Sequence, residues 1–324
     1  MKKIALALLT LAVGATAACS AGNDDAGTKL KVGVLFPGSL SDDGFMQSGY
    51  EGYQRIEKSL ADKVALTKVE QVAAADYQQV LTRLASTSTL VVSFGGQTDS
   101  AVKQVAQAFP NVKFVEVGGP ADAVPPANLA YYDPVQADGG FLAGAYAALT
   151  SKSGKIGFVG GMELPAIVKT ARAFEQGAKH IRADISVLAP VYVGDFNDVA
   201  KAKQAAQADV GAGADVFGQQ LNLGRQGLAQ AAKEGGAALV GGPLVKACGS
   251  EAGFTGYVKS DTGAELEYAV NAVLDNTFKA EQVRFGIASS TGATDIVLCG
   301  ADAQVTAAMA KVKQDLAAGT IKIS

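Results

Sequence analysis

The sequence predicts a two-lobed α/β protein in which each lobe is a parallel sheet flanked by helices, and two observations carry this prediction. Short apolar runs alternate along the chain with segments of helical spacing, which is the pattern of β–α–β units. The pattern also occurs twice, because KVGVLFPG from Lys31 is matched by KIGFVGGM from Lys155, with a helix-like segment after each. Two such sets in a chain of 324 residues indicate two similar lobes.

The strands expected in the two sets correspond one to one. In each set the second strand ends in an acidic and aromatic turn, AADY or GDFND, and is followed by amphipathic spacing. The expected ranges are Val64–Val72, Leu90–Phe94 and Val112–Val117 in the first set, and Ile185–Val193, Asp215–Phe217 and Ala237–Gly241 in the second.

Further elements connect and complete the two sets. A strand and a glycine-rich helix are expected between them, and the glycines predict tight packing because each costs ~1 kcal/mol relative to alanine in a helix. The expected ranges are Leu129–Tyr132 and Val135–Leu149 between the sets, then Phe254–Lys259, Ala264–Leu274, Val283–Ile287, Asp295–Leu298 and Ala303–Ala317 after them.

The chain is expected to pass between the lobes three times, near Asp133, near Gly253 and near Gly286. The first lobe then comprises residues 29–133 and 254–286, and the second comprises residues 134–253 and 287–324. Such a body brings the carboxyl ends of both sets of strands to a shared cleft, where open α/β sheets bind ligands.

The first nineteen residues, MKKIALALLTLAVGATAAC, are typical of a secretory signal peptide. The apolar stretch is shorter than the ~20 residues that span a bilayer. The segment from Thr16 to Cys19 resembles a lipoprotein cleavage box, so we expect a signal peptide at 1–18 and a lipid on Cys19. Ordinary cleavage after Ala18 is the alternative. Residues 19–28 would then be a polar tether, with too little apolar surface to order itself.

Composition excludes several classes of function. The chain has 28 basic and 31 acidic residues, no basic block and no tryptophan, so we expect no nucleic-acid partner. Besides Cys19 it has two cysteines, Cys248 and Cys299. An even pair in an exported protein favours a disulfide over two buried free thiols.

The loop between Phe36 and Phe45 is the first candidate for ligand contact. It follows a buried strand and contains Asp42 and Asp43, and Phe45 lies just beyond these acids. Helix capping explains one acidic residue there, but two exceed what a single cap needs.

A search for catalytic residues finds none that form a set. His180 is the only histidine and lies in a charged, helix-like segment, and no nucleophile elbow or phosphate-binding loop occurs. His and Cys are too few for a metal cluster. Only an acid–base pair of Asp42 or Asp43 with Asp195 remains, so we expect no enzyme, cofactor or metal.

From Lys31 onward, the chain resembles the basic membrane protein family of substrate-binding lipoproteins, which serve ABC importers and include purine nucleoside receptors. The resemblance implies a periplasmic-binding-protein type I fold, a small-molecule ligand held between the lobes, and ABC permease subunits as partners. We expect a monomer that is anchored by its lipid to the outer face of the cytoplasmic membrane or to the periplasmic side of an outer membrane. The motifs are SDDGFMQSGYEG (41–52), FLAGAYAALTSKSGKIGFVGGMELP (141–165), FEQGAK (174–179), YVGDFNDVAKAKQAAQ (192–207), GADVFGQ (213–219), YVKSD (257–261) and the terminal AAGTIKIS.

The resemblance also implies ligand contacts at particular residues. The family's acidic-aromatic loop falls on Asp42, Asp43 and Phe45, its second aromatic falls on Phe196, and its lysine falls on Lys259. Asn222, in a loop after a second-lobe strand, can donate to and accept from the edge of a base. Two rings on opposite lobes would sandwich a flat heterocycle.

The chain departs from the family's pattern in ways that bear on the ligand. Met46 replaces the usual Asn after the first aromatic, and Asp195 stands where the family has Ser. The Asp that holds ribose in nucleoside receptors is missing from VGGPLVKAC, and another is replaced around Gly118. A purine base or another flat polar metabolite is therefore as well supported as a nucleoside. A ligand-sensing lipoprotein and a cleft hydrolase are the alternatives.

Overall fold

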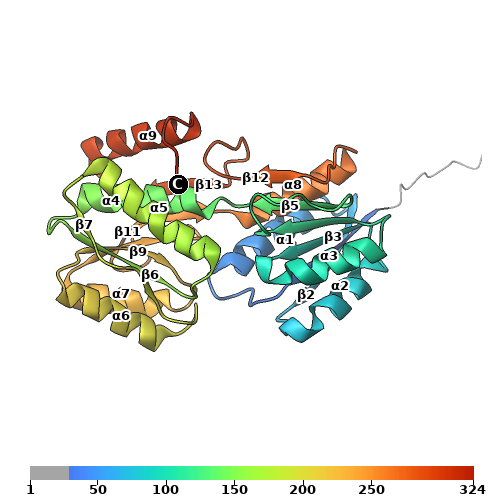
Figure 1. Cartoon of the computed structure of the whole chain (residues 1–324), viewed down its shortest axis with the longest axis horizontal. Coiled ribbons are helices and arrows are strands. Elements are labelled where there is room, and N and C mark those ends of the chain that lie inside the picture. The colour runs from blue at the N-terminus through green and yellow to red at the C-terminus, as the bar shows by residue number, and fades with distance from the viewer. Residues whose placement is uncertain (1–28) are drawn as a thin grey trace, which may run out of the picture.

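The computed structural model describes residues 29–324, which form two α/β lobes side by side along the long axis of the molecule (Figure 1). The two-lobed α/β fold expected from the sequence is confirmed. The expected signal peptide, Cys19 and the tether to residue 28 lie outside the described residues. From residue 29 onward, no helix is long and apolar enough to cross a membrane.

The first lobe is built on a six-stranded parallel sheet with the order β12-β5-β4-β3-β1-β2. Strands β1 to β5 contribute residues to two cores, one on each face of the sheet, whereas β12 contributes only Val283, to the first of them. Helices α1 and α8 cover one face, and α2 and α3 cover the other. The bounds are β1 (Leu30–Phe36), β2 (Val64–Glu70), β3 (Leu90–Phe94), β4 (Lys113–Val117), β5 (Leu129–Asp133) and β12 (Gln282–Arg284), with α1 (Phe45–Ser59), η1 (Ala74–Asp76), α2 (Tyr77–Ala85), η2 (Gly96–Thr98), α3 (Asp99–Ala108) and α8 (Thr262–Leu274).

The second lobe repeats this plan with the strand order β13-β11-β10-β9-β6-β7, and β8 also pairs with β6. All pairs are parallel except β11 with β13. Helices α4, α5 and α9 cover one face, and α6 and α7 cover the other. The bounds are β6 (Lys155–Gly160), β7 (Ser186–Val187), β8 (Val191–Tyr192), β9 (Val216–Gln220), β10 (Ala238–Gly241), β11 (Phe254–Ser260) and β13 (Thr294–Leu298), with α4 (Gln136–Thr150), α5 (Pro165–Ile181), α6 (Val199–Gly211), α7 (Arg225–Gly235) and α9 (Ala303–Ala317).

Helices α4 and α5 pack with their backbones in contact, as the glycines of the first of them predict. A Cβ atom on Gly144 would lie 1.9 Å from the carbonyl oxygen of Phe174, and one on Gly177 would lie 2.0 Å from that of Phe141. No side chain fits at either position, so both glycines are required by the approach of the two helices.

The second passage between the lobes differs from the expectation. Strand β11 pairs with β10 and β13, so Phe254–Ser260 belongs to the second sheet and not to the first lobe. The chain crosses between Ser260 and Thr262, where α8 begins, and the expected crossing near Gly253 is wrong. Gly253 has a φ of +86° and marks a turn before the strand, but a turn does not reveal which sheet the next strand joins.

The other two passages agree with the expectation. After β5 ends at Asp133, the chain enters α4, which packs in the second core. Residues 286–293 run along the boundary, with Phe285 and Ala293 in the core of the first lobe and Ile287 against the core of the second. The hinge between the lobes thus consists of three connecting segments.

Cys248 and Cys299 are joined by a disulfide, with their Cα atoms 5.4 Å apart. The bond fastens the long loop between β10 and β11 to the residue that follows β13. The sequence had left two free thiols open as the alternative, and the structure contradicts that alternative.

Candidate functional site between the two lobes

The loops that face each other between the lobes all leave the carboxyl ends of parallel strands. In the first lobe this is the loop 37–44 between β1 and α1, and in the second lobe they are the loops after β9 and β10, which contact it through Asn222 and Lys246. A polar contact between loop 37–44 and the loop after β9 joins the lobes directly. This arrangement is the one in which open α/β sheets bind ligands.

Asp42 is buried, with 5% of its surface exposed, and its carboxylate joins the two lobes. Oδ2 accepts a hydrogen bond of 2.7 Å from Nδ2 of Asn222, and Oδ1 accepts one of 3.1 Å from the backbone N–H of Gly44. Burial raises the pKa of Asp42, and the two hydrogen bonds oppose that shift. Gly44 and not an acidic residue stands at the N-cap of α1, which has no side-chain cap, so capping does not explain Asp42 or Asp43.

The lobes approach so closely here that a side chain at position 44 would displace the amide of Asn222. A Cβ atom on Gly44 would lie 2.2 Å from Oδ1 of Asn222. Asp42 and Asn222, both predicted from the sequence, are therefore brought together.

Asp43 also crosses the boundary, but its partners are two residues that the sequence did not indicate. Its Oδ2 accepts a hydrogen bond of 2.8 Å from Nη2 of Arg225, and its Oδ1 lies 2.5 Å from Nζ of Lys246. Arg225 is 2% exposed and also binds Glu251 at 2.9 Å. Both oxygens of Asp43 are thus used in contacts between protein side chains.

The two predicted aromatic residues lie on opposite lobes. Phe45 is half-buried at the start of α1, where its ring meets Phe94 edge-on at a centroid distance of 6.3 Å. Phe196 is half-buried over Gly161 at the end of β6, and its carbonyl oxygen accepts hydrogen bonds from the backbone N–H groups of Asn222 and Gly224. Among the described residues, the two rings do not pair with each other, and each remains partly exposed.

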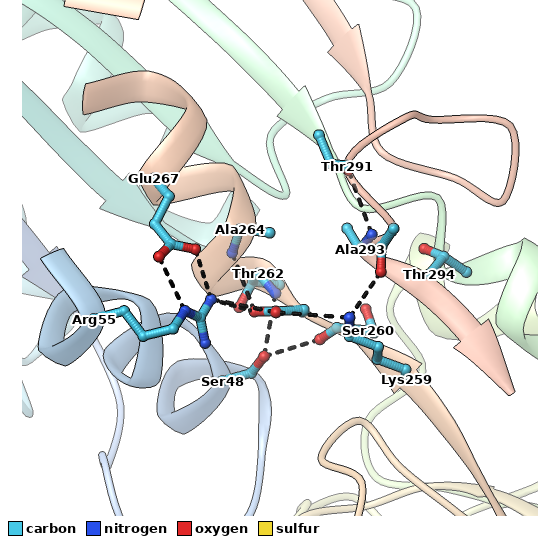
Figure 2. Close-up of polar contacts among 12 residues, drawn as sticks. Ser48, Arg55, Lys259, Ser260, Thr262, Ala264, Glu267, Thr291, Ala293 and Thr294 are labelled. Atoms are coloured by element: carbon cyan, nitrogen blue, oxygen red, sulfur yellow. Dashed lines mark hydrogen bonds and ion pairs between the residues drawn. The ribbon is translucent and has the colours of Figure 1, made fainter. Parts of the chain in front are cut away.

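Lys259 is not brought to these residues. Its Nζ donates a hydrogen bond of 2.8 Å to the carbonyl oxygen of Gly292, and it lies 4.0 Å from Asp261. Figure 2 places it in the hinge, where β11 leads into α8.

The hinge is fastened to α1 by the polar network in Figure 2. The hydroxyl of Ser48 donates to the carbonyl oxygen of Ser260 and accepts from the N–H of Thr262, at 2.9 and 3.1 Å. Thr262 in turn donates through Oγ1 to the carbonyl oxygen of Phe45 at 3.1 Å. The second passage is therefore bonded to the first turn of α1, which carries the Phe45 ring.

A pair of amides at the base of the interlobe region was not anticipated. Nε2 of Gln220, at the end of β9, donates a hydrogen bond of 2.8 Å to Oε1 of Gln136, the first residue of α4. The Oε1 atom of Gln220 is buried and has no partner among residues 29–324. In the sequence, only the glutamines that follow the expected strand Asp215–Phe217 indicated polar side chains at this position.

The remaining acid of the catalytic alternative has a structural partner. Asp195 is exposed and accepts a hydrogen bond of 2.8 Å from the N–H of Asn197. His180 is exposed near the end of α5, with its ring 5.8 Å from that of Phe141. The part of the chain that the structure describes contains no group of His, Cys, Asp or Glu that could hold a metal ion.

Two open hollows lie elsewhere, along α5 and the C-terminal segment. Their volumes are about 750 and 480 Å³, and both are lined by Arg172 and Ser324. Exposed side chains of both charges, including Glu175, Lys179 and Lys322, form the walls of the first. They lack the enclosed, largely apolar lining that binds most small ligands.

Comparison with known proteins identifies the relatives of this chain. A family model described as "ABC transporter substrate-binding protein PnrA-like" matches residues 29–289. The chain is 29% identical over 271 residues to Purine-binding protein BAB2_0673 from Brucella abortus, covering 80% of this chain and 73% of the relative. It is 28% identical to ABC transporter nucleoside-binding protein BmpA from Lactococcus lactis, covering 100% of this chain and 99% of the relative.

Solved structures share the fold. A solute-binding protein of an ABC transporter system from Aeropyrum pernix superimposes with a TM-score of 0.78 at 19% identity, covering 90% of this chain and 92% of that one. The two lobes thus have the same fold as this solute-binding protein. The chain belongs to the family of PnrA-like substrate-binding proteins of ABC transporters.

Proposed function

We propose that this protein captures a flat polar molecule, a purine base in the first place, between its lobes and delivers it to an ABC importer as a monomer. The observation that carries the proposal is the placement of Phe45 and Phe196 on opposite lobes, beside the contact between Asp42 and Asn222. Closure of the lobes on a planar ring would stack it between the two phenyl groups, which prefer offset or edge-on contacts with other rings.

In this proposal the polar residues form hydrogen bonds with the edge of the base. Asp42 accepts hydrogen bonds, and Asn222 both donates and accepts them, so together they match a heterocycle with alternating donors and acceptors. Asp43 takes part through the lobe contact described above. Lys259 remains a predicted contact, and it would require the bond to Gly292 to open.

A base is favoured over a nucleoside by the loop between β10 and β11. Nucleoside receptors of this family are expected to hold the ribose with an Asp in this region, whereas here the loop contributes Lys246, which is bound to Asp43. The name of the Brucella abortus relative, a purine-binding protein, agrees with this choice.

Isothermal titration calorimetry of the wild-type protein tests the proposal, with adenine, hypoxanthine, guanine, adenosine, guanosine and thiamine as ligands. Binding of at least one purine base is expected, with weaker or no binding of its ribosylated form. The absence of heat with every purine would rule out a purine ligand. Mass spectrometry of small molecules that copurify with the protein would then identify the class to test next.

We further propose that Cys19 carries a diacylglycerol anchor that holds the protein at the extracytoplasmic face of a membrane. A Cys19→Ala variant is then expected to move from the detergent phase to the aqueous phase in a Triton X-114 partition. Wild-type protein that partitions into the aqueous phase like the variant would show that Cys19 is not lipidated.

A further inference from the structure

The charged side chains at the lobe boundary form a socket on the second lobe for one acid of the first. The socket consists of Arg225, Lys246 and Glu251, and the acid is Asp43. We propose that Asp43 and this socket act as a latch that sets the balance between open and closed lobes, with Arg225 as a positioning residue that acts through Asp43. This inference goes beyond the ligand proposal.

The socket is held together within the second lobe. Nη2 of Arg225, the first residue of α7, donates to Glu251 at 2.9 Å, and Glu251 also accepts a hydrogen bond of 3.1 Å from the hydroxyl of Tyr257 on β11. These bonds join parts of one lobe, so they do not depend on closure. When the lobes separate, Asp43 moves away with the first lobe, and the three socket residues stay together on the second.

The disulfide fastens the same loop. Cys248 lies between Lys246 and Glu251 in the sequence and is bonded to Cys299. Two of the three socket residues are thus on a segment that is covalently tied to the end of β13. The socket is therefore preorganised, and closing the lobes need not order this loop.

The charges of the two parts are complementary. The socket holds two cations and one anion, which leaves a net positive charge facing the carboxylate of Asp43. With the lobes in contact as in this structure, Arg225 is 2% exposed, and its Nη1 has no partner among the described residues. Arg225 keeps Glu251 as a partner when the lobes part, so closure adds the attraction between the Asp43 carboxylate and the net positive charge of the socket.

Asp43 is itself held ready for this contact. Its φ of +59° lies in the left-handed region, which Asp and Asn adopt more readily than most other L-residues. Its backbone N–H donates a hydrogen bond of 2.7 Å to Oε1 of Gln47, two residues into α1. The conformation is thus fixed within the first lobe, and the carboxylate is presented to the second.

The replacement Asp43→Asn is the decisive variant. Asparagine has the same shape and also adopts the left-handed conformation, but it carries no charge for Arg225 and Lys246. Lys203→Gln is the matched control, because the pair that it breaks, Lys203 with Glu234, joins α6 and α7 within one lobe. The interlobe distance is measured by spin labels on Ser86→Cys and Asp184→Cys, exposed positions on the two lobes, at 20 and 500 mM NaCl without ligand.

In the wild type, the closed fraction is expected to fall as salt rises, because salt screens charges that become solvated when the lobes part. Asp43→Asn is expected to shift the ratio of closed to open molecules about tenfold toward open and to remove the salt dependence. Lys203→Gln should match the wild type. An Asp43→Asn variant with the closed fraction and salt response of the wild type would overturn the latch.

A second measurement separates the latch from a direct contact with the ligand. Hypoxanthine and adenine are neutral near pH 7.5, so a salt dependence of their binding must arise from charges of the protein. If either binds, its affinity for the wild type should fall between 20 and 500 mM NaCl, while its affinity for Asp43→Asn should be nearly constant. Equal salt slopes would contradict the latch. If neither binds, the purine proposal fails, but the distance measurement still decides on the latch.

Discussion

Replacement of Phe196 by alanine is expected to weaken purine binding by roughly 5- to 150-fold, which corresponds to ~1–3 kcal/mol. The variant removes one face of the proposed sandwich. The loop itself should persist, because its anchors are hydrogen bonds from the backbone of Asn222 and Gly224 to the carbonyl oxygen of residue 196. Phe45→Ala is expected to have an effect of the same order from the other lobe.

Calorimetry with the purine that binds the wild type most tightly measures both effects. Phe196→Tyr serves as the control because it keeps a ring, and its affinity should remain within a few-fold of the wild type. Unchanged affinity in both alanine variants would remove the sandwich from the mechanism, even if a purine binds.

Stability is expected to fall as the pH rises through the range from about 5 to 8, and Glu116 is a main cause. This residue of β4 is fully buried. Its Oε1 accepts a hydrogen bond of 3.1 Å from the Thr98 hydroxyl, and its Oε2 has no partner among residues 29–324. Burial, together with the negative charge of Asp99 nearby, raises the pKa of Glu116 to about 8. An unfolded chain releases this proton near pH 4.5, whereas the folded chain retains it. Rising pH therefore favours the unfolded chain, by an amount on the order of 4–5 kcal/mol once both forms are ionised.

Urea unfolding of the wild type and Glu116→Gln at pH 5.5 and pH 8.5 tests this expectation. Glutamine keeps the shape without the charge, so the free energy of unfolding of the variant should change less between the two pH values. Glu265, which is also buried with a raised pKa, contributes equally to both proteins and cancels in the comparison. Glu57→Gln, at an exposed position of α1, is the control. If Glu116→Gln loses as much stability as the wild type, Glu116 is not the titrating group.

Local patterns in the sequence predicted most of the strands and helices of the fold. The range Leu90–Phe94 was predicted as a strand and is β3, and Ala303–Ala317 was predicted as a helix and is α9, with the same bounds. Apolar runs and helical periodicity are properties of short segments, and burial on both faces of parallel strands makes them easy to read.

Pairing between distant segments was harder to foresee. The expected strand Ile185–Val193 is two short strands, β7 and β8, which both pair with β6. Pro190 lies between them, and it has no N–H to continue the ladder. The signal was present in the sequence, but its effect depends on which neighbour the strand pairs with. In the same way, the local sequence of β11 did not reveal that this strand pairs with β10 and β13 in the second sheet.

The candidate site also contains some residues that the local sequence indicated and others that only the fold brings together. Asp42 and Asn222 were predicted singly, from their places in loops, and the structure joins them. Arg225 and Lys246 carry no local signal, because one begins a helix and the other stands in a loop whose partner is in the first lobe. Only the packing of the two lobes against each other reveals that these residues meet.

The order of the chain through the two sheets has a consequence for folding. The first sheet gains its outermost strand β12 and its covering helix α8 only from residues after 260, and the second sheet is completed by β13. Neither lobe can reach its final form before the residues after 260, the last fifth of the chain, have been made. Pairings between segments so far apart require costly loop closure and form slowly. The newly made chain therefore stays unfolded longer than a protein with contiguous domains, and an unfolded chain is the form that can be threaded across a membrane.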